Sequence, residues 1–154
     1  MLNVTRLREF LAEVKATIPG INYTQIVVDD SELVKHIEAR KTSENSFLFA
    51  IMPQFGINGN EDQLKWNNQL MFMVLDKSTD KNFTNHDSYI DMFGNTQAIA
   101  KAFIDYLLEQ KSGDNGELCG LVNELKENSI VVNPVWRKAG CNGWSIEIDL
   151  LSNV

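Results

Sequence analysis

The sequence predicts an α+β domain in which a mostly antiparallel sheet of about four to five strands packs against an N-terminal helix and a long helix near residues 87–110. Apolar residues near the N-terminus recur every three or four positions, which is typical of a helix with one buried face. Two internal runs are apolar throughout, and the C-terminal segment alternates apolar and polar residues, both of which are typical of strands. Helices combined with hairpins of strands favour an antiparallel sheet covered by helices.

Length and composition predict one domain over residues 1–154, because 154 residues can bury roughly two-thirds of the unfolded surface in a single core. Hydrophobic residues make up 44% and charged residues 23% of the chain, as in globular proteins. The net charge is −7 and the acids are spread along the chain, so direct sequence-specific binding to nucleic acid is not expected. No signal peptide or run of about 18 apolar residues is visible, so we expect neither secretion nor a membrane partner.

The first helix is predicted to end at Pro19-Gly20, because proline cannot continue the helical hydrogen bonds. Its apolar stripe consists of Val4, Leu7, Leu11, Val14 and Ile18. A β-branched strand over residues 21–28 follows, and Ser31 can cap a short helix from about Glu32 to Arg40.

The apolar runs at 46–52 and 70–75 predict two central strands. The segment Pro53 to Lys65 between them is rich in Asn and Gly and longer than a normal hairpin loop, so we expect a loop where a partner could dock. A long helix is expected to open at Asn85 or Asp87, to be interrupted by Gly94 and to end near Gly113.

After this helix, the pattern from Leu118 to Leu125 suggests one or two further helical turns. Residues 130–136 predict a strand, in which Pro134 favours an edge position or a bulge. Lys138 to Gly143 is expected to form a hairpin turn before a last strand in which Trp144, Ile146, Ile148 and Leu150 share one face.

No phosphate-binding glycine loop, nucleophile elbow or helical zinc-protease motif occurs, so we predict no catalytic, cofactor-binding or metal-binding residues. The weaker candidates have simpler structural interpretations. Glu147 and Asp149 could be paired carboxylates but are more typical of a solvated strand face. His36 and His86 are interpreted as solvated or capping residues, and Cys119 and Cys141 as packed thiols. The segment Asp76–Asn82 resembles a calcium-binding loop, but the pattern fails at Lys81.

Four short segments resemble small structural proteins of bacteriophages and prophages, of the tail-terminator or head-tail connector type. These segments are Ile18-Pro19-Gly20-Ile21, the strand Phe47 to Met52 running into Pro53, Leu75-Asp76 before the long helix, and the terminal Gly143 to Ile148.

The resemblance implies a non-catalytic protein that assembles with copies of itself into a ring and contacts phage tail or neck proteins, first in the bacterial cytoplasm and then in the virion. It implies that exposed loops and an edge strand make these contacts. The candidate interface residues are Phe55, Ile57, Trp66, Trp136 and Trp144. An acidic surface would also let DNA pass through such a ring.

Two rival functions follow from the residues. A small ligand-binding or adaptor domain would enclose a pocket lined by Trp66, Phe72, Tyr89 or Trp136. An enzyme with a site assembled from distant residues would show ionisable groups with shifted pKa values clustered in a cleft.

Overall fold

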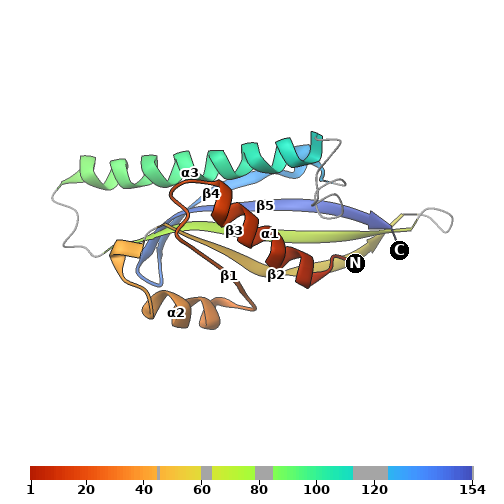
Figure 1. Ribbon diagram of the computed structural model, residues 1–154, viewed down its shortest axis with the longest axis horizontal. Helices are drawn as coiled ribbons and strands as arrows, with labels where there is room; N and C mark the ends of the chain where they lie inside the picture. The colour runs from red at the N-terminus through yellow and green to blue at the C-terminus, as the bar shows by residue number, and fades with distance from the viewer. Residues whose placement is uncertain (45, 60–63, 79–84, 113–124, 154) are drawn as a thin grey trace.

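A computed structural model describes residues 1–44, 46–59, 64–78, 85–112 and 125–153, and these residues form the predicted α+β fold (Figure 1). Five strands make one sheet in the order β1-β2-β3-β5-β4, in which β1 and β2 run parallel and all other pairs are antiparallel. The strands are β1 (Tyr23–Val27), β2 (Phe47–Asn58), β3 (Lys65–Lys77), β4 (Val131–Lys138) and β5 (Cys141–Asn153). The helices are α1 (Val4–Thr17), α2 (Asp30–Glu38) and α3 (His86–Ser112), with the 3-10 turns η1 (Thr42–Glu44) and η3 (Glu127–Ser129).

One face of the sheet, here called the two-helix face, packs against α1 and α3. Its centre is a cluster of aromatic rings from three elements. The ring centroid of Phe72 on β3 lies 6.3 Å from that of Phe10 on α1 and 4.9 Å from that of Phe103 on α3. All three side chains are buried, so this cluster fixes both helices on the central strand.

The opposite face, here called the α2 face, is only partly covered. Leu33 and Ile37 of α2 are buried against Phe47, Phe49 and Met73 of the sheet. Farther along the same strands, Ile51 and Met71 are half-buried. Among the described residues, no helix lies over this second half of the α2 face.

The helix ends agree with the sequence prediction for α1 and correct it for α2. α1 ends at Thr17, and Ile18 takes an extended conformation before Pro19. The predicted cap of α2, Ser31, is wrong: Asp29 is the N-cap and its carboxylate accepts a hydrogen bond from the Glu32 amide. A carboxylate at this position is also stabilised by the positive end of the helix dipole. Ser and Asp are both favourable N-cap residues, so the sequence alone did not distinguish Asp29 from Ser31.

The predicted loop from Pro53 to Lys65 is also wrong. β2 continues to Asn58 and β3 begins at Lys65, with Asn58 paired to Lys65. The pairing of β2 with β3 shifts register between Ile51 and Gln54. This β-bulge accommodates Pro53, and regular pairing resumes beyond it. The two strands therefore extend as a hairpin arm, defined here as residues 54–58 and 65–68, which reaches toward the end of the sheet opposite α2 (Figure 1).

α3 runs without interruption through Gly94, contrary to the expected break there. The proposed helical turns at Leu118 to Val122 lie outside the described residues, whereas Leu125 forms a β-bridge with Leu150. The chain was predicted to turn at Lys138 to Gly143, and its tightest point is Ala139-Gly140, where both residues have positive φ angles of 54° and 74°. β4 is an edge strand, as the position of Pro134 predicted.

Gly143 leaves no room for a side chain, because a Cβ there would lie 2.0 Å from the backbone oxygen of Val74, and its φ of 156° is unfavourable for other residues. We expect Gly143→Ala to lower the free energy of unfolding by about 3 kcal/mol. The matched control is Gly94→Ala, at an open helical position, which should raise it by about 1 kcal/mol. Urea denaturation followed by circular dichroism measures both, and equal effects of the two substitutions would contradict the close approach at Gly143.

Candidate functional site

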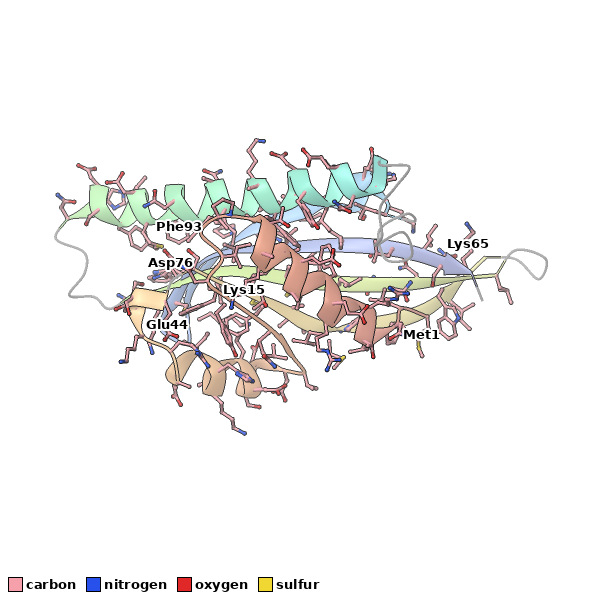
Figure 2. All side chains as sticks on the ribbon, in the orientation of Figure 1. Met1, Lys15, Glu44, Lys65, Asp76 and Phe93 are labelled. Atoms are coloured by element: carbon pink, nitrogen blue, oxygen red, sulfur yellow. The ribbon has the colours of Figure 1, made fainter. Side chains whose placement is uncertain are left out.

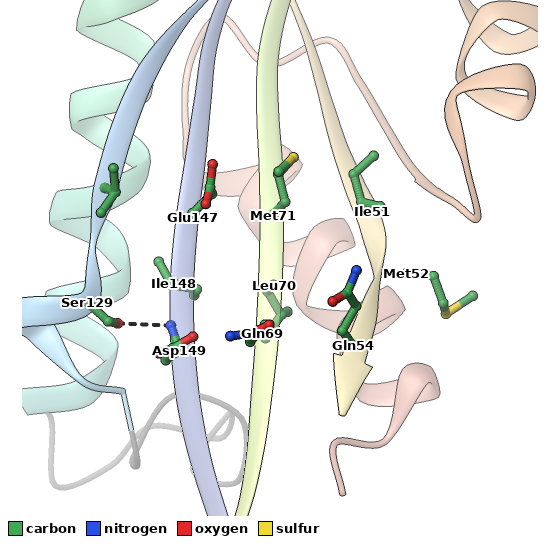
Figure 3. Close-up of a pocket in the computed structure, with 11 residues that line it drawn as sticks. Ile51, Met52, Gln54, Gln69, Leu70, Met71, Ser129, Glu147, Ile148 and Asp149 are labelled. Carbon is green, nitrogen blue, oxygen red and sulfur yellow. Dashed lines mark hydrogen bonds between the residues drawn. The ribbon is translucent and has the colours of Figure 1, made fainter. Parts of the chain in front are cut away.

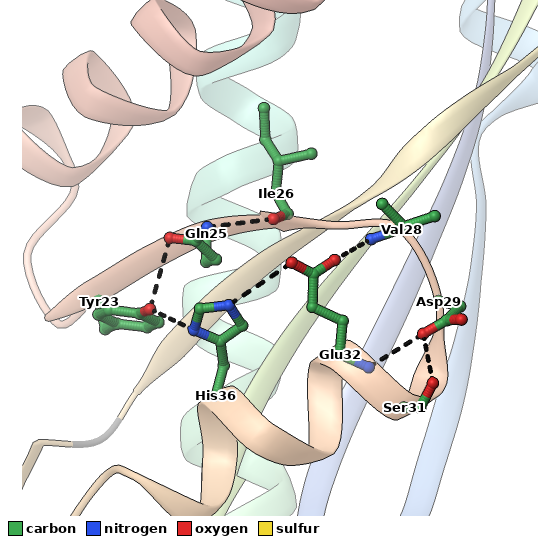
Figure 4. A network of polar contacts seen from close by, with 8 residues as sticks. All are labelled: Tyr23, Gln25, Ile26, Val28, Asp29, Ser31, Glu32 and His36. Atoms are coloured by element: carbon green, nitrogen blue, oxygen red, sulfur yellow. Dashed lines mark hydrogen bonds and ion pairs between the residues drawn. The ribbon is translucent and has the colours of Figure 1, made fainter.

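His36, the first histidine candidate, joins α2 to β1 (Figure 4). Its Nδ1 lies 3.1 Å from the hydroxyl of Tyr23, and its Nε2 lies 3.9 Å from a carboxylate oxygen of Glu32. The other Glu32 oxygen accepts a hydrogen bond from the Val28 amide. Every partner thus belongs to the junction between β1 and α2, and the arrangement is that of a structural link.

The second histidine and Cys141 also occupy structural positions. His86 begins α3 and stacks on Tyr89 with 6.2 Å between ring centroids. Cys141 is buried, and burial raises the pKa of its thiol to about 12, so it is a poor nucleophile near neutral pH. Cys119 lies outside the described residues, as do residues 79–82 of the proposed calcium-like loop. Among the described residues, no group of three or more His, Cys, Asp and Glu could hold a metal ion.

Asp76 is the carboxylate that burial affects most clearly among the described residues. It lies at the end of β3 opposite Lys65 (Figure 2), and burial raises the pKa of its carboxyl, while a hydrogen bond to Ser46 lowers it. Its Oδ1 is buried without a hydrogen-bond partner among the described residues. The ionised form of Asp76 is therefore unfavourable for the stability of the fold at neutral pH.

The open half of the α2 face contains a pocket of about 390 Å³, here called the groove (Figure 3). The strand register builds it as two cross-strand rows. The first row runs across four strands through Val131, Glu147, Met71 and Ile51. The second row runs through Asp149, Gln69 and Gln54. One row is largely apolar and the other polar, so the groove can take an amphipathic group.

The groove carries negative charge. Glu147 is exposed and Asp149 is half-buried, and none of the described residues that line the pocket is basic. The backbone amide of Asp149 donates a hydrogen bond to the hydroxyl of Ser129, which in turn donates to the carbonyl of Lys126 and so fixes this end of β5. Glu147 and Asp149, interpreted from the sequence as a solvated strand face, thus lie on one face of β5 beside Met71 and Val131.

Trp136, on the edge strand β4, is the most exposed of the predicted interface residues. Its side chain is 65% exposed, and the guanidinium carbon of Arg137 lies 5.1 Å from the centre of its ring. Val131 and Val132 on the same strand are also exposed. Several exposed apolar side chains on one edge strand are unusual for a monomer.

The hairpin arm presents three of the other predicted residues on one face. Ile57 pairs with Trp66 and is 58% exposed, and Phe55 lies two residues away on the same strand. On the same face Asn68, the strand partner of Phe55, is fully buried: its amide oxygen accepts from the Leu2 amide, and its amide nitrogen donates to the Leu150 carbonyl. Asn68 thus ties the base of the arm to the N-terminus and to β5.

Trp144 differs from the other four residues. It is half-buried under α3, where its indole nitrogen donates a 3.1 Å hydrogen bond to the Phe93 carbonyl and its ring meets the Phe93 ring edge-on. This side chain holds α3 to β5. None of Trp66, Phe72, Tyr89 and Trp136, the residues of the rival ligand-binding hypothesis, lines the groove, and Phe72 lies in the core.

Asp76 gives a prediction of pH-dependent stability. Because its pKa is raised in the folded state, the folded protein binds the proton more tightly than the unfolded chain, and stability from this group is lost as pH rises through the folded pKa. We expect Asp76→Asn to raise the melting temperature at pH 7 and to give a gain that shrinks as pH falls toward 4. Melting curves between pH 4 and 7.5 measure it, with the exposed Asp91→Asn as control. A gain that does not change with pH would contradict the buried ionised carboxylate.

No helix in the described part of the chain is long and apolar enough to cross a membrane. Comparison with known proteins adds no identification: no protein-family model matches the chain, and none of the curated proteins is significantly similar to it.

Proposed function

We propose that this chain is a non-catalytic assembly protein of a phage or prophage virion, similar to tail terminators or head-tail connectors, which acts by associating with copies of itself and with tail or neck proteins. The observation that carries the proposal is the gathering of exposed apolar side chains on the hairpin arm and on β4. Phe55 and Ile57 are exposed on the hairpin arm, and Val131, Val132 and Trp136 are exposed on β4. Such side chains gain free energy when a partner removes them from water.

The geometry of the two surfaces supports self-association. The arm is the extended end of the β2–β3 hairpin, and β4 is the opposite edge of the sheet from β1. Two different surfaces on one subunit can repeat head to tail, and such contacts close into a ring when the rotation between subunits allows it. A protein of this kind would act in the bacterial cytoplasm during assembly and afterwards in the virion.

The groove favours a second candidate, a small adaptor domain that binds a ligand or peptide. Its volume of about 390 Å³ lies within the usual size of ligand sites. Its position on an open sheet face, with Glu147 exposed, suits a side chain or peptide better than an enclosed small molecule. We therefore rank the adaptor function second.

The test of self-assembly is the solution mass by light scattering over a range of concentrations and at two salt levels. We expect the wild-type protein to shift toward a closed oligomer as its concentration rises. The double variant Phe55→Ser with Ile57→Ser should weaken association by roughly ten- to a hundredfold for each apolar side chain that the interface buries.

The matched control is Val28→Ser, which removes an apolar side chain that is 62% exposed and lies outside both surfaces. It should leave the association unchanged. A wild-type protein that remains monomeric at the highest attainable concentration would argue against the assembly function and in favour of the adaptor.

A further inference from the structure

The exposed Trp136 and Arg137 lie in a β-bulge that the fold holds in place. β4 pairs with β5 through Val135 and Gly143, and pairs again through Lys138 and Cys141. Two residues of β4 therefore stand opposite the single residue Asn142 of β5, and we call these two residues, Trp136 and Arg137, the knob. Bulges commonly redirect side chains at the edge of a sheet.

The knob has a strained backbone that hydrogen bonds of a buried side chain hold in place. Arg137 has a φ of 52°, in the left-handed region that residues with a Cβ rarely adopt. Its amide donates a 2.7 Å hydrogen bond to the side chain of Asn142, and Asn142 in turn donates a 2.6 Å bond to the Ser78 hydroxyl. Asn142 is buried, so a buried polar link maintains an exposed and strained bulge.

We propose that the groove of one copy receives the knob of a second copy of this chain. The inference rests on the proposed self-assembly and names the surface that receives β4; Phe55 and Ile57 of the hairpin arm do not line the groove and would make a separate contact in the same assembly. The apolar row of the groove ends on one side at Ile51 and includes Met71, whose thioether packs well against aromatic rings. The carboxylates of Glu147 and Asp149 match the positive charge of Arg137, and Arg–carboxylate pairs are strong and directional.

A subunit cannot fill its own groove with its own knob. Val131 borders the groove at the start of β4, and Trp136 lies five residues farther along a strand that pairing with β5 holds extended, about 16 Å away at the usual rise of a strand. The contact must therefore join two subunits through different surfaces. The net charge of −7 on each subunit opposes association in general. The local attraction between Arg137 and the groove carboxylates would therefore favour the orientation in which the knob of one subunit faces the groove of the other.

The decisive experiment mixes two variants that each lack one side of the contact. Trp136→Ala removes the exposed ring, and Glu147→Lys reverses the charge in the groove; both side chains are exposed, so both variants should fold. Circular dichroism and thermal melting verify the fold. We expect each variant alone to need roughly tenfold or more higher concentration than the wild type to associate.

The equimolar mixture should behave differently from either variant alone. Trp136→Ala retains an intact groove and Glu147→Lys retains an intact knob, so one wild-type contact can form between them. We expect light scattering to show association of the mixture at a concentration at which neither variant alone associates, with Val28→Ser again as the control that assembles like the wild type. Arg137→Gly should also weaken association, without lowering the melting temperature, because glycine accepts the left-handed backbone.

Three outcomes would overturn the inference. If the wild type assembles and the mixture stays monomeric, the two surfaces are not partners, although self-assembly itself stands. If either variant alone assembles like the wild type, the surface that it alters is not part of the contact. If the wild type is itself a strict monomer, the knob-and-groove contact fails together with the proposed assembly function.

Discussion

The register of β3 is the constraint on which the rest of the structure depends. β3 pairs with β2 on one side and with β5 along its whole length on the other. Because side chains alternate, this register assigns Phe72 to the two-helix face and Met71 to the α2 face. A slip by one residue would exchange the faces and expose the aromatic core, so the burial of Phe72 between α1 and α3 fixes the positions of all rows across the sheet.

The groove follows from a mismatch in length between the helices and the strands. β3 has 13 residues and is about 44 Å long, and the 27 residues of α3 give about 40 Å, so one helix can accompany the strand over its length. α2 has nine residues and is about 14 Å long. It therefore shields the α2 face near Phe47 and Phe49, whereas Ile51 and Met71 remain half-buried.

Much of the fold could be predicted from local patterns, because those patterns report burial. The alternation from Trp144 to Leu150, the apolar run at 70–75 and the stripe on α1 each correspond to an observed element. The hairpin arm could not be predicted, because Asn and Gly in residues 54–58 have low strand propensity and the pairing with β3 overrides it. Gly94 is accepted in α3 for a similar reason, since packing of the long helix outweighs a cost of about 1 kcal/mol.

The candidate surfaces, like the fold, could be predicted from the sequence only in part. The exposed Phe55, Ile57 and Trp136 could be singled out by residue type, but the half-buried Trp144 could not be separated from them without its contact to Phe93. The groove depends on which residues of four strands share a row, and the sequence contains no signal for that register. The Trp136–Arg137 bulge likewise depends on the pairing of β4 with β5, although Pro134 and the turn after Lys138 indicated an irregular edge.

The irregular edge also affects how copies of this protein can meet. A regular apolar edge strand would invite pairing of backbones, which can continue without limit. In β4, Pro134 has no amide hydrogen to donate, and the bulge at Trp136 and Arg137 breaks the regular spacing of the donors and acceptors. Strand addition at this edge is therefore disfavoured along much of its length. Association through side chains, with Trp136 and Arg137 held in one orientation by Asn142, has a defined geometry, and head-to-tail contacts of one defined geometry end when they close into a ring.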